Sequence, residues 1–182
     1  MTSTLKYQIL AGLPGEGPLP LQFSATGQGH HSEGVVIRFS PEAMPSWVGN
    51  FQPGFCRFSC VLELGSTFHV MIVAGGQGYI VDIRSGVLLK HFGGDIEYLV
   101  SIPELDSVLV SNGLWLRLVK GEAEVWCSEH LSLDGIRNIQ VSLADGIITG
   151  EGWYVDDCWY PFKVCISSGE ATGGVFESLD FS

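Results

Sequence analysis

The sequence VMIVAGGQGYIVDIRSG, at residues 70–86, decides the fold expected for this chain. It combines an apolar strand, a glycine corner, a second apolar strand and a Ser-Gly turn. The pattern returns at residues 107–121 (SVLVSNGLWLRLVKG) and 146–169 (GIITGEGWYVDDCWYPFKVCISSG). Glycine turns between β-rich runs indicate hairpins. A repeat of this kind is typical of stacked or radially arranged β-units.

Further short apolar runs flank the three repeats and extend each of them. One follows every glycine turn, at residues 87–92, 123–127 and 170–172, and others precede the second and third repeats, at residues 96–102 and 136–143. The unit is therefore predicted to be an antiparallel meander of three to four strands. The fold class expected is all-β, either a small or incomplete β-propeller-like body or a β-sandwich, because both use closely spaced hairpins.

The chain is expected to form a single all-β domain over residues 1–182. Residues 1–34 should be an irregular N-terminal segment with an edge strand near residues 19–25, where proline is tolerated. Residues 35–182 should hold the repeated meander units, with residues 19–64 as a divergent first unit. Within that unit, residues 35–40 predict a strand and residues 42–50 at most one turn of α- or 3₁₀-helix.

Composition excludes several classes of partner. The net charge is −11 and only 16% of residues are charged, so few basic residues could form a patch. Nucleic acid and anionic membrane surfaces should be repelled. The acidity suits either solubility or a basic protein partner. The N-terminus does not resemble a signal peptide and the cysteine count is odd, at five, which favours a cytoplasmic protein with reduced thiols.

An aromatic insertion interrupts the third repeat. Its residues are Trp153, Tyr154, Asp156, Asp157, Trp159 and Tyr160. Large aromatic side chains are common anchors of binding surfaces, because they bury much area at a low cost in side-chain entropy. We therefore interpret these residues as a candidate surface for a protein or ligand. The alternative is that half of the aromatics point into the core while the two aspartates close a hairpin.

Other chemistry-bearing residues give weaker signals. His30, His31 and Glu33 are metal-ligand types in a glycine-rich loop, but no further ligand is evident, so they are secondary candidates and a solvated loop is expected. Cys127 and His130 are close in sequence without indicating a catalytic pair. The glycines at residues 75–78 precede a strand rather than a helix, which indicates a β-corner and not a phosphate loop. No catalytic residue, metal or cofactor is predicted.

The last third of the chain carries a resemblance. Residues 150–174, with Gly150-Glu151-Gly152-Trp153 and Trp159-Tyr160-Pro161-Phe162, resemble the C-terminal signature of small bacterial β-proteins that look like immunity or accessory proteins found beside toxins. The strand–turn–strand pattern also resembles the blades of WD40- or PQQ-like propellers, although the Trp-Asp pair of WD40 blades is missing. The resemblance implies an inhibitory binding role and transfers no catalytic residue.

Three functions follow as hypotheses. The first is a non-enzymatic protein-binding module, such as an immunity-type inhibitor of a basic toxin. The second is an enzyme or small-molecule binder with its site at the mouth of the β-fold, where the residues to examine are His30, His31, Glu33, Asp156 and Asp157. The third is a structural or assembly role through exposed strand edges.

Overall fold

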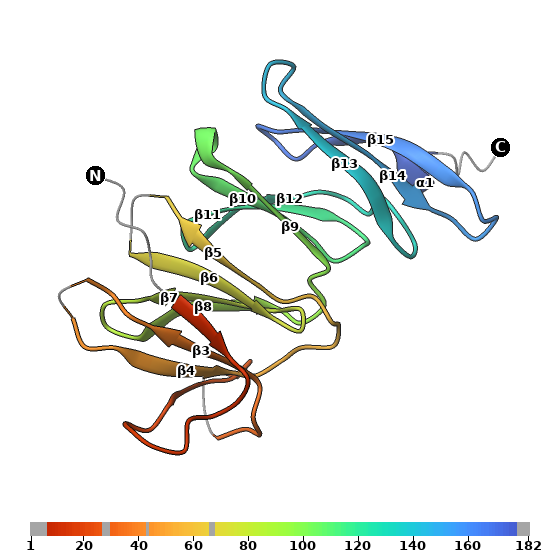
Figure 1. The fold of residues 1–182 in the computed structure, drawn as a ribbon. Helices are drawn as coiled ribbons and strands as arrows, with labels where there is room; N and C mark the ends of the chain where they lie inside the picture. The colour runs from red at the N-terminus through yellow and green to blue at the C-terminus, as the bar shows by residue number, and fades with distance from the viewer. Residues whose placement is uncertain (1–6, 27–29, 43, 66–67, 178–182) are drawn as a thin grey trace. The chain divides into compact units, whose positions relative to one another are not determined.

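The computed structural model describes residues 7–26, 30–42, 44–65 and 68–177. The chain divides into two compact units, Met1–Ile96 and Glu97–Ser182. Each unit contains two four-stranded sheets, which Figure 1 shows as successive groups along the colour bar. The all-β prediction is confirmed, and each sheet has the strand number of a propeller blade.

The first sheet departs from a simple meander. Its strands are β1 (Tyr7–Leu10), β2 (Leu21–Phe23), β3 (Val35–Phe39) and β4 (Trp47–Phe51), and their order is β1-β3-β4-β2. The expected edge strand is present as β2, but it runs parallel to β4. The expectation of a helical turn over residues 42–50 is wrong at its C-terminal end. Residues of β4 pair with β3 on one side and β2 on the other, so tertiary pairing overrides the weak local signal there.

The other three sheets are meanders of consecutive antiparallel strands, as the repeat predicts. The second sheet contains β5 (Cys60–Leu64), β6 (His69–Ala74), β7 (Gln77–Asp82) and β8 (Val87–Gly93). The third contains β9 (Tyr98–Ile102), β10 (Ser107–Ser111), β11 (Leu116–Lys120) and β12 (Ala123–Cys127). The fourth contains β13 (Ile136–Ser142), β14 (Ile147–Trp153), β15 (Trp159–Cys165) and β16 (Ala171–Gly173). One boundary differs from expectation. Strand β5 pairs with β6, so it opens the second sheet instead of closing the divergent first unit.

The repeated turns have one backbone conformation. Gly86, Gly121 and Gly169 follow the third strand of their sheets with φ of 67°, 55° and 77°, a region that L side chains rarely adopt. In two of these turns the glycine N–H donates to the carbonyl oxygen at the start of the turn, on Asp82 at 2.8 Å and on Cys165 at 2.8 Å. The glycine signal that defined the repeat therefore has a conformational cause.

In the first unit, the core lies between the β1–β4 and β5–β8 sheets. Aromatic rings supply one side of it: Phe23 stacks on Phe51 with centroids 4.5 Å apart, and Phe39 stacks on Trp47 at the same distance. The other side comes mainly from β6 and β7 and is aliphatic except for Tyr79. The buried Tyr79 donates its hydroxyl proton to the carbonyl oxygen of Gln52 at 2.7 Å, so its polar end is satisfied.

The second unit has an equivalent core between its two meanders. Leu109, Leu118 and Trp126 come from the β9–β12 sheet, and Ile148 and Phe162 come from the β13–β16 sheet. Alternation explains this choice, because successive residues of a strand point to opposite faces. On β14 and β15 the residues between the core positions therefore occupy the opposite face of the sheet.

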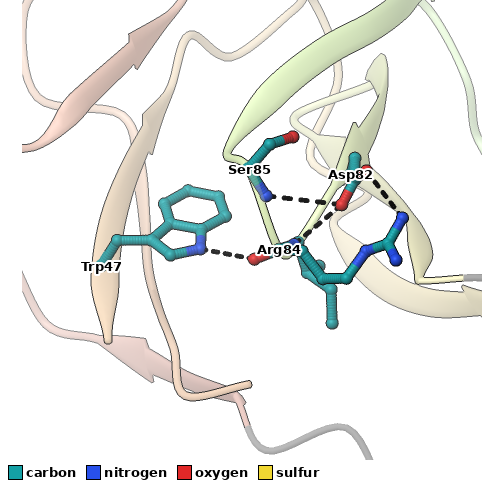
Figure 2. A network of polar contacts seen from close by, with 5 residues as sticks. Trp47, Asp82, Arg84 and Ser85 are labelled. Carbon is teal, nitrogen blue, oxygen red and sulfur yellow. Dashed lines mark hydrogen bonds and ion pairs between the residues drawn. The ribbon is translucent and has the colours of Figure 1, made fainter. Parts of the chain in front are cut away.

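In each unit, a tryptophan of one sheet donates a hydrogen bond to a turn of the other sheet. The indole N–H of Trp47 donates to the carbonyl oxygen of Ile83 at 2.8 Å, beside the turn in which the Asp82 carboxylate accepts the backbone N–H groups of Arg84 and Ser85 (Figure 2). In the second unit, Trp126 donates to the carbonyl oxygen of Ile166 at 2.7 Å. Both acceptors lie three residues before the turn glycine of the neighbouring sheet.

Helix is scarce in the described part of the chain. It comprises one 3₁₀ turn (Pro103–Leu105) and the short α1 (Gly174–Glu177). Neither element is long and apolar enough to cross a membrane. The candidate functional residues therefore lie on strands or on the loops that connect them.

Candidate functional site

The aromatic insertion extends a hairpin beyond the body of its sheet. Strands β14 and β15 pair along their whole length, ending with Trp153 opposite Trp159 (Figure 1). Beyond that pair, the Tyr154 N–H donates to the carbonyl oxygen of Cys158 and the Asp157 N–H donates to that of Tyr154, both at 3.0 Å. We call residues 153–160 the aromatic tip. It is a closed, hydrogen-bonded hairpin end.

The two tryptophans of the aromatic tip have different surroundings from its two tyrosines. Trp153 and Trp159 occupy the sheet face opposite the core, together with Glu151. The Arg137 guanidinium lies 4.0 Å from the centroid of Trp159, and its Nε donates to Glu151 at 2.8 Å. This arrangement fixes the indole by a cation–π contact and the cation by an ion pair. Both tryptophans are only half-buried, so each keeps an accessible part.

The two tyrosines form the other part of the aromatic tip. Their rings meet edge to face, with centroids 6.1 Å apart. The Tyr160 hydroxyl donates to Oδ2 of Asp156 at 2.6 Å, and Oδ1 of Asp156 accepts the Cys158 N–H at 3.0 Å. The bond from Tyr160 lowers the pKa of Asp156, and the same bond raises the pKa of Tyr160 to about 12. Asp156 therefore stays ionised and Tyr160 stays protonated throughout the neutral range.

The end of the tip is charged and exposed. Asp156 and Asp157 are both exposed. Val155, which comes directly before them in the chain, is 67% exposed. Asp157 adopts φ of 60°, a left-handed conformation that aspartate tolerates in turns. The structure thus brings all six predicted residues into one compact feature. It combines half-buried aromatic rings with two exposed carboxylates on a hydrogen-bonded hairpin end.

Ser132, which the sequence reasoning missed, holds the base of this hairpin. The serine is fully buried, and its hydroxyl donates to the carbonyl oxygen of Gly135 at 2.6 Å. The same oxygen accepts the backbone N–H groups of Trp153 at 3.0 Å and Asp134 at 3.2 Å. The only sequence signal was the Asp134-Gly135 turn that follows it, which predicts a loop but not a contact across 21 positions.

The three secondary candidates lie in the first unit, and two of them, His31 and Glu33, make contacts with nearby backbone. Nδ1 of His31 is 2.6 Å from the carbonyl oxygen of Ser32, and Nε2 is 3.2 Å from that of Asn50. Oε2 of Glu33 accepts the Leu13 N–H at 2.8 Å. His30 is exposed. Among the described residues, no group of three or more potential metal-ligating side chains gathers anywhere. His31 and Glu33 therefore hold their loop in place through contacts with backbone groups.

All five cysteines are unpaired, and their environments differ. Burial raises the pKa of Cys60, whereas hydrogen bonds from Ser167 and Ser168 lower the pKa of Cys165 to about 7. Cys165 occupies the turn position that Asp82 holds in the second sheet, so the Cys165 thiolate can accept bonds that a carboxylate accepts there. Cys127 is exposed and adjoins a loop in which His130 stacks on Trp115, with ring centroids 5.0 Å apart.

Cys165 should be alkylated by iodoacetamide with a midpoint near pH 7, since the thiolate is the reactive form and its fraction rises as pH passes the pKa of about 7. Peptide mass spectrometry after timed alkylation from about pH 5.5 to about pH 10.5, a range that extends more than one unit beyond both the lowered and the ordinary thiol pKa, gives the profile. Ser167→Ala should move the midpoint upward. A wild-type midpoint at the ordinary thiol value of 9.0 would contradict the assignment.

Comparison with known proteins adds little to this geometry. No family model matches the chain, and no curated protein matches it. A solved structure described as the crystal structure of the eukaryotic initiation factor resembles it with a TM-score of 0.42 and 11% identity. The likeness covers 92% of this chain and 41% of that one, so this chain spans less than half of that protein's length. A likeness at this level supports no conclusion about function.

Proposed function

We propose that this protein is a non-enzymatic binding module that captures a basic protein through the aromatic tip. The observation that supports this best is the tip itself, in which half-buried aromatic rings and the exposed carboxylates of Asp156 and Asp157 share one hydrogen-bonded hairpin end. Rings of this kind are the usual anchors of protein interfaces, and charges at a rim steer the encounter with an oppositely charged partner.

Preorganisation favours binding at this tip. The Tyr160–Asp156 bond, the Arg137–Trp159 contact and the buried Ser132 fix its side chains and base before a partner arrives. Side chains that are already ordered lose less entropy on association, so more of the contact energy appears as affinity. The net charge of −11 extends the attraction for a basic partner beyond the tip.

A finer form of the proposal concerns location and partner. The five unpaired cysteines suit a reducing compartment, which supports a cytoplasmic site of action. A basic toxin domain is the partner that the immunity-protein resemblance suggests. The module would inhibit it by covering its active site with a surface of complementary charge and shape, without any chemistry of its own.

Affinity capture from the native host tests this function with matched variants. The bait is the wild-type protein or the Trp153→Ala/Trp159→Ala double variant, and Phe55→Ala serves as control because Phe55 is an aromatic residue 95% exposed in the first unit. The expected result is a basic protein retained by wild type and by Phe55→Ala. Its Kd, measured by calorimetry, should rise by about tenfold or more in the double variant, since hot-spot aromatics commonly contribute that much.

Charge is tested separately. Asp156→Asn/Asp157→Asn should slow association of the captured partner, and the loss should shrink as salt is raised, because screened charges steer less. The proposal fails if no protein is retained, or if the tryptophan variant binds like wild type once its fold is verified by circular dichroism. It also fails if the retained protein is acidic.

A further inference from the structure

The face of the β13–β16 sheet opposite the core carries a shallow cavity of about 530 Å³ that is open to solvent. Thr149 and Glu151 line it from β14, and Pro161 and Lys163 line it from β15. These positions alternate with core residues such as Ile148 and Phe162, which explains why they point to the opposite face. A volume of this size falls within the range of small-molecule sites, about 300–1,000 Å³.

Four polar side chains form a single row across the floor of this cavity. Strand register places Gln140 opposite Thr149, Thr149 opposite Lys163, and Lys163 opposite Thr172, one residue from each strand of the sheet. Directly opposed residues have Cβ atoms about 4.5–5.5 Å apart. The row therefore presents an amide, a hydroxyl, an ammonium and a second hydroxyl at regular intervals. All four residues line the cavity.

The charge of the cavity is set by Lys163. Oε2 of Glu151 accepts hydrogen bonds at 2.8 Å from Nε of Arg137 and from Nδ2 of Asn138, and these bonds lower the pKa of Glu151. The negative charge of Glu151 is thus compensated by the positive charge of Arg137. Lys163 is exposed, and no ion pair joins it to another residue in the described part of the chain. The site is locally cationic in a protein whose net charge is −11.

We propose that this cavity binds a sugar that carries an anionic group, either a carboxylate or a phosphate ester. The Lys163 ammonium would take the anion, and the Thr149 and Thr172 hydroxyls on either side of it would donate to the same oxygens. The Gln140 amide and the free oxygen of the Asn138 amide suit sugar hydroxyls, which both donate and accept. The Pro161 ring supplies an apolar surface for the C–H groups of the ring.

A bare anion is a poorer match for the same groups. The cavity is far larger than a phosphate ion, and its lining includes several neutral hydrogen-bonding side chains besides the single ammonium. This inference is independent of the proposed function, because the row lies outside residues 153–160 and uses none of the aromatic tip. The two can therefore succeed or fail separately.

Titration by heteronuclear NMR and calorimetry tests the site with defined probes. Glucuronate carries the carboxylate and glucose 6-phosphate carries the phosphate ester. Glucose has the sugar ring without an anionic group, and inorganic phosphate has the anionic group without a sugar. Lys163→Gln removes the ammonium, and Lys120→Gln is the matched control, since it makes the same change in net charge at an exposed residue of β11 outside the cavity lining. Both substitutions are at exposed positions, so both variants should keep the fold.

The expected result is saturable binding of one or both anionic sugars, with amide shifts centred on β14, β15 and β16. Affinity should fall about tenfold or more in Lys163→Gln, as expected for loss of a charge-assisted contact, and stay unchanged in Lys120→Gln. Glucose and inorganic phosphate should bind at least about tenfold more weakly. No saturation by either anionic sugar would overturn the proposal. Equal loss in the two variants, or inorganic phosphate binding as tightly as the sugars, would also overturn it.

Discussion

Replacing Gly152 by alanine should lower the unfolding free energy of the second unit by about 3 kcal/mol or more, a large part of the roughly 5–15 kcal/mol that ordinary domains have. A Cβ at this position would lie 2.0 Å from the backbone oxygen of Leu131 and 2.9 Å from its carbonyl carbon. The obstacle is main chain and cannot rotate away. Leu131 is itself fully buried in the core, so a shift of its backbone would open packed contacts.

The measurement is urea unfolding followed by tryptophan fluorescence. Four of the five tryptophans, Trp115, Trp126, Trp153 and Trp159, belong to the second unit, so the signal reports mainly on it. Gly146→Ala is the matched control on the same sheet. Gly146 has φ of 68° and nothing within 4 Å of an added Cβ, so only backbone strain of about 1 kcal/mol is expected. Equal losses in the two variants would show that close approach at Gly152 is unimportant.

Gly152 also illustrates what the sequence could and could not predict. The glycines of the repeated turns were interpretable because their role is local, and a Ser-Gly pair between apolar runs predicts a turn without knowledge of the rest of the chain. Gly152 looks the same in sequence, but its requirement comes from Leu131, 21 positions earlier. Ser132, whose hydroxyl bonds the backbone of Trp153, was missed for the same reason.

The same distinction explains the strands that were misplaced. Residues 47–51 contain glycine and asparagine and give a weak local strand signal, yet β4 forms because β2 and β3 pair with it from both sides. Strand β2 is parallel to β4, which no hairpin signal can predict. By contrast, β12 was predicted to the residue, since it follows directly from the glycine turn that precedes it.

The candidate sites divide in the same manner. The aromatic tip was predicted as a group because its residues are contiguous, although the pairing of Tyr160 with Asp156 and of Trp159 with Arg137 needed the structure. The polar row of the cavity was not predicted, because Gln140, Thr149, Lys163 and Thr172 are brought together only by the register of four strands. A shift of one residue would move each of them to the core face.

Trp126→Ala should cost about 3–5 kcal/mol of unfolding free energy, the usual range for deleting a large aromatic side chain from a core. Trp126 is 7% exposed, and its indole lies against Gly169, where an added Cβ would be 2.7 Å from Cδ2. Its N–H also donates to the carbonyl oxygen of Ile166. The substitution therefore removes packing between the two sheets of the unit and the hydrogen bond that joins them.

Two further variants separate these contributions. Trp126→Phe keeps much of the apolar area and loses the hydrogen bond, so a smaller cost is expected, about 1–2 kcal/mol. Trp115→Ala is the control within the same unit, because Trp115 is half-buried and stacks on the exposed His130 rather than in the core. Its loss should be about 1 kcal/mol. Urea unfolding followed by far-UV circular dichroism avoids the change in fluorophore number. If Trp126→Ala cost no more than Trp115→Ala, the two sheets of the second unit would not depend on this tryptophan.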